Sequence, residues 1–352
     1  MINSELHKKL QENEVDAILV TNPYNRRYIT NFTGTAGVAL ITTSDAFFVT
    51  DFRYVNQAKE QAPDFTVIEH QGPIEDKLAE LINKLAIKRL GFEADHVTYA
   101  TYSLYEEKFA VEVVAVKEII ESLRLIKTSQ EIAILKDAAT IADDAFEHIV
   151  EFIKPGVREI DIANELEIFM RKQGATSSSF DIIVASGHRS ALPHGVASDK
   201  VIENGELVTM DYGALYKGYC SDITRTVAVG NISDELKEIY ETVLEAQVRG
   251  VNGIKPKMTG KEADALTRDY IEKQGFGEYF GHSTGHGIGL EIHEGPGLSP
   301  RSETVLKKNM VVTVEPGIYI PGIGGCRIED DIVLTETGNE RLTFARKELI
   351  QL

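Results

Sequence analysis

Residues 201–213 read VIENGELVTMDYG, and residues 305–317 read VLKKNMVVTVEPG. The two stretches align without a gap. Each carries an apolar run typical of a strand buried on both faces, and Asp211 of the first matches Glu315 of the second. Upstream of each lies a stretch of 22 residues that begins Ile-Lys-Pro and ends Lys-Gln-Gly, and a helix-like segment precedes that stretch. The common order of these matches indicates an internal duplication, in which two α/β half-domains bury their strands together.

The duplication places a second pair of acids in matching positions. Asp222 follows the first strand in the sequence CSD, and Glu329 follows the second in CRIE. If a pseudo-twofold axis relates the two halves, the carboxylates of Asp211, Asp222, Glu315 and Glu329 meet at the centre. Four buried carboxylates cannot all stay ionised without positive charge within a few ångströms.

We expect divalent metal ions to balance the negative charge of these carboxylates. The nearby Arg225 and Arg327 are too few, whereas two divalent ions carry four positive charges. His286 is the expected imidazole ligand, because glycines on both sides let backbone and metal approach closely. Carboxylates with one imidazole suit Mn, Co, Fe or Zn and exclude a sulfur-rich structural zinc site. A pair of such ions activates water and stabilises a tetrahedral transition state.

Each of these residues also has a plain structural interpretation. Asp211 alone reads as a turn or cap residue at a strand end. Glu329-Asp330-Asp331 could form a solvated acidic patch, but the apolar residues 332–334 follow at once, as in a strand. The glycines around His286 resemble a phosphate loop, but the lysine of a P-loop is missing. The metal hypothesis rests on the whole set in duplicated positions, not on any member.

The chain preceding the repeat predicts a separate domain. Residues 1–124 alternate strand-like and helix-like stretches, as in an α/β domain. Thr128 and Glu131 form a capping-box pair that opens a long helix from Ser129 to about Phe152. We therefore expect a smaller amino-terminal α/β domain at 1–124 and a catalytic domain at 125–352.

The amino-acid composition disfavours several classes of binding partner. The chain has 352 residues, with 37 Lys and Arg against 55 Asp and Glu, so its net charge of −18 disfavours nucleic acid and anionic membrane surfaces. No apolar run is long enough to span a bilayer, and the start, Met1 to Glu5, has no features of an export signal. Two cysteines cannot build a disulfide framework. A cytoplasmic location is expected.

Taken together, the motifs resemble the two-metal peptidases of the pita-bread fold, and within them the prolidase and aminopeptidase P branch. The motifs that carry the resemblance are DYG ending at residue 213, SDITRT at 221–226, HSTGHGIGLEIHEGP at 282–296, EPG at 315–317 and RIED at 327–330. The resemblance implies an α+β fold: a pita-bread catalytic domain with an internal pseudo-twofold repeat, preceded by the smaller α/β domain.

The same resemblance implies roles for individual residues. The metal ligands would be Asp211, Asp222, His286, Glu315 and Glu329, with Glu315 also moving a proton. His194 and His293 would be catalytic histidines near the scissile bond, and His282 and Arg327 would contribute to substrate binding.

The amino-terminal domain resembles that of the same branch through residues 28–34 (YITNFTG) and 50–54 (TDFRY). Methionine aminopeptidases usually lack this domain, so its presence favours the proline-directed branch. In that branch the domain often helps to form a dimer, so a homodimer is implied.

The resulting hypothesis is hydrolysis of the peptide bond before proline, with two divalent ions per subunit and manganese as the first expectation. A dipeptidase (prolidase) is favoured, because many aminopeptidases P are longer. An aminopeptidase P that releases the first residue of longer Xaa-Pro peptides is the alternative. A non-catalytic peptide-binding module and creatinase-like hydrolysis are less favoured, because the whole ligand set is present.

Overall fold

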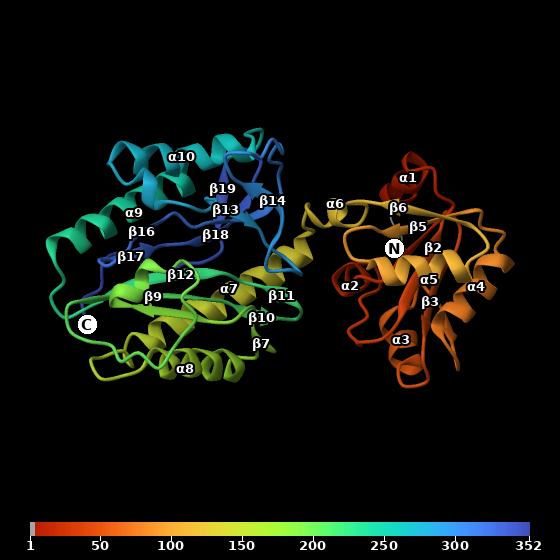
Figure 1. The fold of residues 1–352 in the computed structure, drawn as a ribbon, viewed down its shortest axis with the longest axis horizontal. Helices are drawn as coiled ribbons and strands as arrows, with labels where there is room; N and C mark the ends of the chain where they lie inside the picture. Colours follow the sequence, from red (N-terminus) through yellow and green to blue (C-terminus); the bar gives the residue numbers. More distant parts are fainter. Residues whose placement is uncertain (1–3) are drawn as a thin grey trace. The chain divides into compact units, whose positions relative to one another are not determined.

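The computed structural model describes residues 4–352. Residues 1–3, which belong to the start used for the export expectation, lie outside the described residues. The chain divides into two compact units, of which the first ends at Arg124 and the second runs Leu125–Leu352 (Figure 1).

The first unit contains one six-stranded sheet in the order β4-β3-β2-β1-β5-β6. β2 is antiparallel to both of its neighbours, and the other pairs are parallel. Side chains alternate between the two faces: Ile18 joins one apolar cluster and Leu19 the other. The elements of this unit are α1 (Ser4–Glu12), β1 (Ala17–Val20), α2 (Pro23–Thr30), β2 (Val38–Thr42), β3 (Ala46–Thr50), α3 (Val55–Gln61), β4 (Thr66–Glu69), α4 (Ile74–Lys84), β5 (Arg89–Glu93), α5 (Tyr99–Lys108), β6 (Glu112–Val116) and α6 (Glu121–Arg124).

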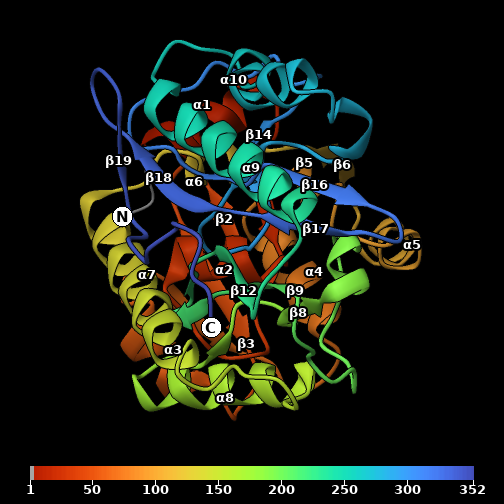
Figure 2. The ribbon, with the colours of Figure 1, turned by 90° about the vertical axis from the view of Figure 1, so that its left-hand side faces the viewer.

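The second unit places strands between helices. In both Figure 1 and Figure 2, α8 covers one outer side of the strands, and α9 and α10 cover the opposite side. Its helices are α7 (Ser129–Ile149), α8 (Glu159–Lys172), α9 (Asp234–Gly253) and α10 (Gly260–Lys273), with short 3₁₀ turns η1 (Gly187–Ala191) and η2 (Gly277–Tyr279). Its strands are β7 (Ser177–Ser178), β8 (Ile183–Ser186), β9 (Glu206–Tyr212), β10 (Ala214–Tyr216), β11 (Tyr219–Cys220), β12 (Ile223–Val229), β13 (Gly285–Gly287), β14 (Glu294–Leu298), β15 (Val311–Val314), β16 (Gly317–Ile320), β17 (Gly324–Arg327), β18 (Asp330–Leu334) and β19 (Asn339–Arg341).

The internal repeat is visible in the strand pairing. β9 pairs antiparallel with β12 in the order β12-β9-β8, and β15 pairs antiparallel with β18 in the order β14-β13-β15-β18-β19. The halves join where Glu329 N donates to Thr224 O (3.1 Å) and Thr226 Oγ1 donates to Arg327 O (2.8 Å). The first residues of β12 therefore lie beside the residues that directly precede β18.

The start of the second unit follows local sequence signals. Thr128 and Glu131 form the expected capping box at α7, with the Thr128 side chain accepting from Glu131 N and the Glu131 side chain accepting from Thr128 N. The helix ends at Ile149, a few residues before the predicted Phe152.

Cys220 and Cys326 are buried thiols in two different apolar clusters, and they form no disulfide. Burial raises the pKa of each to about 12, so both remain protonated at neutral pH. Among the described residues, no helix has the length and apolar character to cross a membrane.

Candidate active site

The four predicted acids lie where paired strands begin or end. Asp211 is near the end of β9 and faces Thr224 across the pairing with β12, while Asp222 immediately precedes β12. In the other half, Glu315 immediately follows β15 and Glu329 immediately precedes β18. Each half thus contributes one acid from each of two neighbouring antiparallel strands.

Three of these carboxylates converge, and each has one oxygen that accepts no hydrogen bond. One ligand oxygen each of Asp211, Asp222 and Glu329 lies within 4.8 Å of the other two. Asp211 Oδ1, Asp222 Oδ1 and Glu329 Oε1 are all buried and accept no hydrogen bond. Buried acceptors without donors are costly, and a shared cation satisfies all three. The donor set therefore fits divalent metal ions.

His286 and Glu315 complete this cluster. His286 Nε2 lies 3.2 Å from Glu315 Oε1 and 3.7 Å from Asp222 Oδ2. The flanking glycines are required by close packing, because a Cβ on Gly285 would lie 2.0 Å from Thr313 O and one on Gly287 would lie 1.9 Å from a backbone carbonyl. The close approach expected from the sequence is thus to neighbouring strands, and it fixes the direction of the imidazole.

The pKa directions show how strongly the carboxylates repel one another. Burial, followed by the charges of Glu329 and Asp211, raises the pKa of Asp222 well above its ordinary value. Burial and the charges of Glu315 and Asp211 likewise raise the pKa of Glu329. Burial is also the largest single influence on Glu315 and opposes its ionisation, but the hydrogen bond with His286 and the charges of His286, His282 and Arg327 together outweigh it and lower the pKa to about 2. Asp222 and Glu329 are therefore the two acids that most need a nearby cation.

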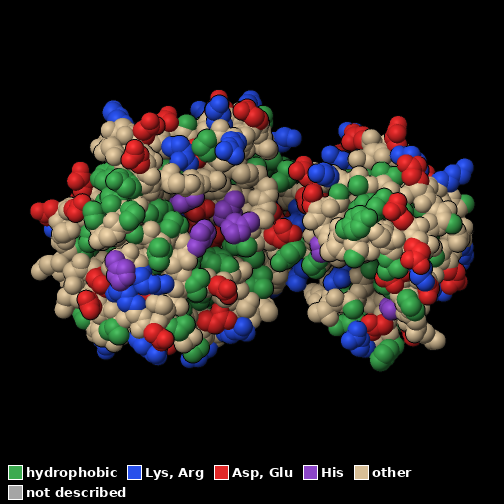
Figure 3. Space-filling model, viewed as in Figure 1, with side chains coloured by type: hydrophobic (Ala, Val, Ile, Leu, Met, Phe, Trp, Pro, Cys, Tyr) green, Lys and Arg blue, Asp and Glu red, His purple; other side chains and the backbone are tan. Residues whose placement is uncertain are grey.

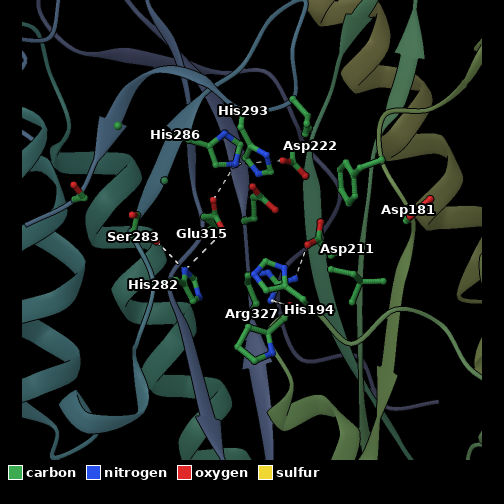
Figure 4. Close-up of a pocket in the computed structure, with 18 of the residues that line it drawn as sticks. Asp181, His194, Asp211, Asp222, His282, Ser283, His286, His293, Glu315 and Arg327 are labelled. Carbon is green, nitrogen blue, oxygen red and sulfur yellow. Dashed lines mark hydrogen bonds and ion pairs between the residues drawn. The ribbon is translucent and has the colours of Figure 1, made fainter. Parts of the chain in front are cut away.

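A cavity of about 600 Å³ opens beside the acids. Figure 3 shows histidines gathered around a hollow on this face of the second unit, and Figure 4 shows Glu315 between His286 and His282. His194 and His293 also line the cavity, and the His293 ring packs edge-on against His286 with centroids 4.4 Å apart. The apolar part of the wall includes Phe180, Ile183, Pro193, Val196 and Ile292.

Arg327 forms an ion pair with Asp211. Its Nη2 lies 2.5 Å from Asp211 Oδ2, and its Nη1 donates to Tyr319 Oη at 2.7 Å. Tyr319 Oη in turn lies 2.9 Å from His282 Nε2. Arg327 and His282 therefore belong to one hydrogen-bonded chain. The sequence analysis missed Tyr319 and also Thr224, whose hydroxyl donates to Glu329 Oε2 at 2.6 Å.

The solvated-patch interpretation of Asp330 and Asp331 is wrong, because both are buried. Asp330 accepts from Arg225 Nη2 at 2.8 Å and from Lys347 Nζ at 2.5 Å, so Arg225 pairs with this acid rather than with the cluster of carboxylates. Asp331 Oδ2 accepts from Asp222 N at 2.9 Å. Burial raises the pKa of Asp331 to about 8.

Comparison with family models matches residues 133–336 to metallopeptidase family M24 and residues 4–126 to the creatinase/prolidase N-terminal domain. The chain belongs to metallopeptidase family M24. The family assignment confirms the predicted class of enzyme and the fold, a pita-bread domain preceded by a creatinase-type domain.

Relatives within M24 extend over the whole chain. The Xaa-Pro dipeptidase of Pyrococcus furiosus is 44% identical, with 98% of each chain covered. A solved structure of an Xaa-Pro dipeptidase from Bacillus anthracis is 65% identical with a TM-score of 0.98, covering 99% of this chain and 98% of that one. A structure of an X-Pro aminopeptidase from Thermotoga maritima is 42% identical with a TM-score of 0.91, covering 98% and 100%.

Proposed function

We propose that this M24 metallopeptidase is an Xaa-Pro dipeptidase, which hydrolyses the bond between the first residue and proline. The observation that carries the metal-dependent chemistry is the cluster of Asp211, Asp222 and Glu329 in the cavity wall, each with one buried oxygen that accepts no hydrogen bond. The substrate class rests on the full-length relatives named Xaa-Pro dipeptidase.

We propose that Asp211, Asp222, His286, Glu315 and Glu329 hold two divalent ions. Oxygen-rich ligands with one imidazole suit manganese first, with cobalt, zinc or iron as alternatives. When bound, such ions polarise the scissile carbonyl and lower the pKa of water toward neutrality.

The chain's own residues would orient the substrate and move a proton. His293 and His194 line the cavity beside the acids, where their N–H groups can donate to the carbonyl oxygen as negative charge develops. Glu315 is ionised at neutral pH, as its lowered pKa requires, and can accept a proton and pass it to the leaving nitrogen. The proton transfer matters because the proline nitrogen must take up a proton to leave as an amine.

Substrate length separates the two candidate activities. The alternative, an aminopeptidase P, is favoured by the similarity to the X-Pro aminopeptidase from Thermotoga maritima. Turnover of Ala-Pro should exceed that of Ala-Pro-Ala and of longer peptides by a large factor in the manganese-loaded protein, with Ala-Ala as the control. Faster release of alanine from the longer peptides would replace the dipeptidase assignment with the aminopeptidase. No cleavage of any Xaa-Pro peptide with any of the four metals would refute both.

We also propose a homodimer, as the sequence resemblance implies, and light scattering with the purified full-length chain tests it. A mass corresponding to one chain would contradict the dimer. The cytoplasmic location stays a prediction from the sequence.

A further inference from the structure

The segment from Phe280 to Thr284 links η2 to β13 and carries His282, yet it belongs to no helix or strand. Backbone carbonyls in such a segment have no ladder partners and must be satisfied in another way. Two carbonyls, those of Phe280 and His282, accept hydrogen bonds from a single side chain on the neighbouring helix α10, that of Arg268.

Arg268 is positioned for this task by an acid one helical turn earlier. Asp264, which is buried, accepts from Arg268 Nε at 2.6 Å and from Nη2 at 2.8 Å. The fixed guanidinium then donates from Nη1 to Phe280 O at 3.0 Å and from Nη2 to His282 O at 2.7 Å. Its carbon lies 4.2 Å from the centroid of the Phe280 ring. Charge-assisted, two-pronged contacts of this kind fix orientation as well as position.

Asp264 also holds the far end of the same segment. Its Oδ1 accepts from Thr284 N at 3.0 Å and from Thr284 Oγ1 at 2.8 Å. Thr284 O in turn accepts from Glu315 N at 2.7 Å. Two side chains on α10 thus fasten both ends of the segment on either side of the His282 ring.

We propose that Asp264 and Arg268 are positioning residues that place His282 at the mouth of the cavity for substrate binding. The His282 ring has a partner on each side: Nε2 lies 2.9 Å from Tyr319 Oη, and Nδ1 lies 4.0 Å from Glu315 Oε2. A segment without ladder bonds keeps that geometry because Arg268 holds its carbonyls. The expected effect on kinetics rests on the proposed peptidase function, whereas the fastening of residues 280–284 by Arg268 and Asp264 does not.

A matched control lies on the adjacent helix. Arg249 pairs with Glu245 at the same i,i+4 spacing (2.7 Å), and its guanidinium carbon lies 4.3 Å from the centroid of the Tyr270 ring. Arg249 is half exposed, and its hydrogen bond runs to the Glu245 side chain. Arg268→Gln and Arg249→Gln therefore each remove an i,i+4 ion pair and a ring contact, but only the first leaves a buried acid, Asp264, without its ion-pair partner and releases the histidine segment.

The experiment combines hydrogen exchange with steady-state kinetics on Ala-Pro in the manganese-loaded full-length protein. In Arg268→Gln we expect faster amide exchange across residues 280–286, a fall in kcat/KM of about 10–100-fold, as for other residues that orient a site, and a partial recovery in Arg268→Lys. Arg249→Gln should match the wild type in both measurements. Adding Arg268→Gln to His282→Ala should lower kcat/KM far less than it does in the wild type, since both changes act through one side chain.

The proposal is overturned if exchange across residues 280–286 is the same in Arg268→Gln and Arg249→Gln, or if the kinetic effects of Arg268→Gln and His282→Ala simply multiply. If Arg268→Gln does not fold, Arg268→Lys supplies both measurements with the same outcomes. A wild-type protein that cleaves no Xaa-Pro peptide would refute the proposed function, while the exchange comparison would still decide whether Arg268 fastens the segment.

Discussion

Glu294→Gln tests how the residue next to His293 is anchored. Lys127 Nζ lies 2.6 Å from Glu294 Oε1, and the two side chains are 1% and 7% exposed. An amide at 294 would leave the buried ammonium without a counter-charge, which costs about 3–5 kcal/mol. For a unit the size of Leu125–Leu352, each kcal/mol corresponds to roughly 2–4 °C, so Tm should fall by about 6–20 °C.

Calorimetry of the wild type and three variants checks this expectation. Lys136 and Glu340 form an exposed pair of nearly the same length, 2.7 Å, so Glu340→Gln should cost less than about 1 kcal/mol. The double variant Lys127→Met with Glu294→Gln removes the stranded charge and should recover most of the lost stability. Equal melting temperatures for Glu294→Gln and Glu340→Gln would show that the buried charge is not what determines stability here.

Three further outcomes are expected. Glu329→Gln should abolish manganese binding in a calorimetric titration and also abolish Ala-Pro cleavage. It should nevertheless raise the Tm of the metal-free protein, because a neutral amide removes the burial cost and the charge repulsion that together raise the pKa of Glu329; an unchanged or lower metal-free Tm would contradict this reasoning. The pKa of Asp222 is also raised in the folded state, so above about pH 4 the folded protein keeps a proton that the unfolded chain has lost. The Tm of the chelated protein should therefore fall as the pH rises toward neutrality, and added manganese should flatten this dependence. A chelated protein that becomes more stable over this range would refute the assignment. Gly287→Ala should destabilise the second unit by about 1–3 kcal/mol and weaken manganese binding, because the new Cβ would lie 1.9 Å from a carbonyl oxygen. Gly338→Ala is the control: its Cβ would meet nothing within 4 Å, so the variant should match the wild type in thermal melts.

The duplicated pattern was enough to predict the strands and the meeting of the acids. Strand burial leaves an apolar run in the sequence, and a matching acid at the end of each run indicates a shared centre once the halves are superposed. Asp211, Asp222 and Glu329 do converge, and His286 and Glu315 lie beside them.

What the sequence analysis missed depends on partners from the opposite half. Thr224 belongs to the first half but donates to Glu329 of the second, and Asp331 of the second accepts from the backbone of Asp222 in the first. No local pattern distinguishes a buried acid that is neutralised by such contacts from one that faces water. The consecutive acids from 329 to 331 therefore left a surface patch open as an alternative; the apolar residues that follow argued against it, and the acids are buried.

The division of the acids between the two halves has a consequence for biosynthesis. A nascent chain that has emerged only as far as Gly275 carries Asp211 and Asp222 but neither glutamate of the second half, so it has at most half of the centre. With the proposed ligand set, a complete metal centre would therefore form only after both halves of the domain have been synthesised and have folded together.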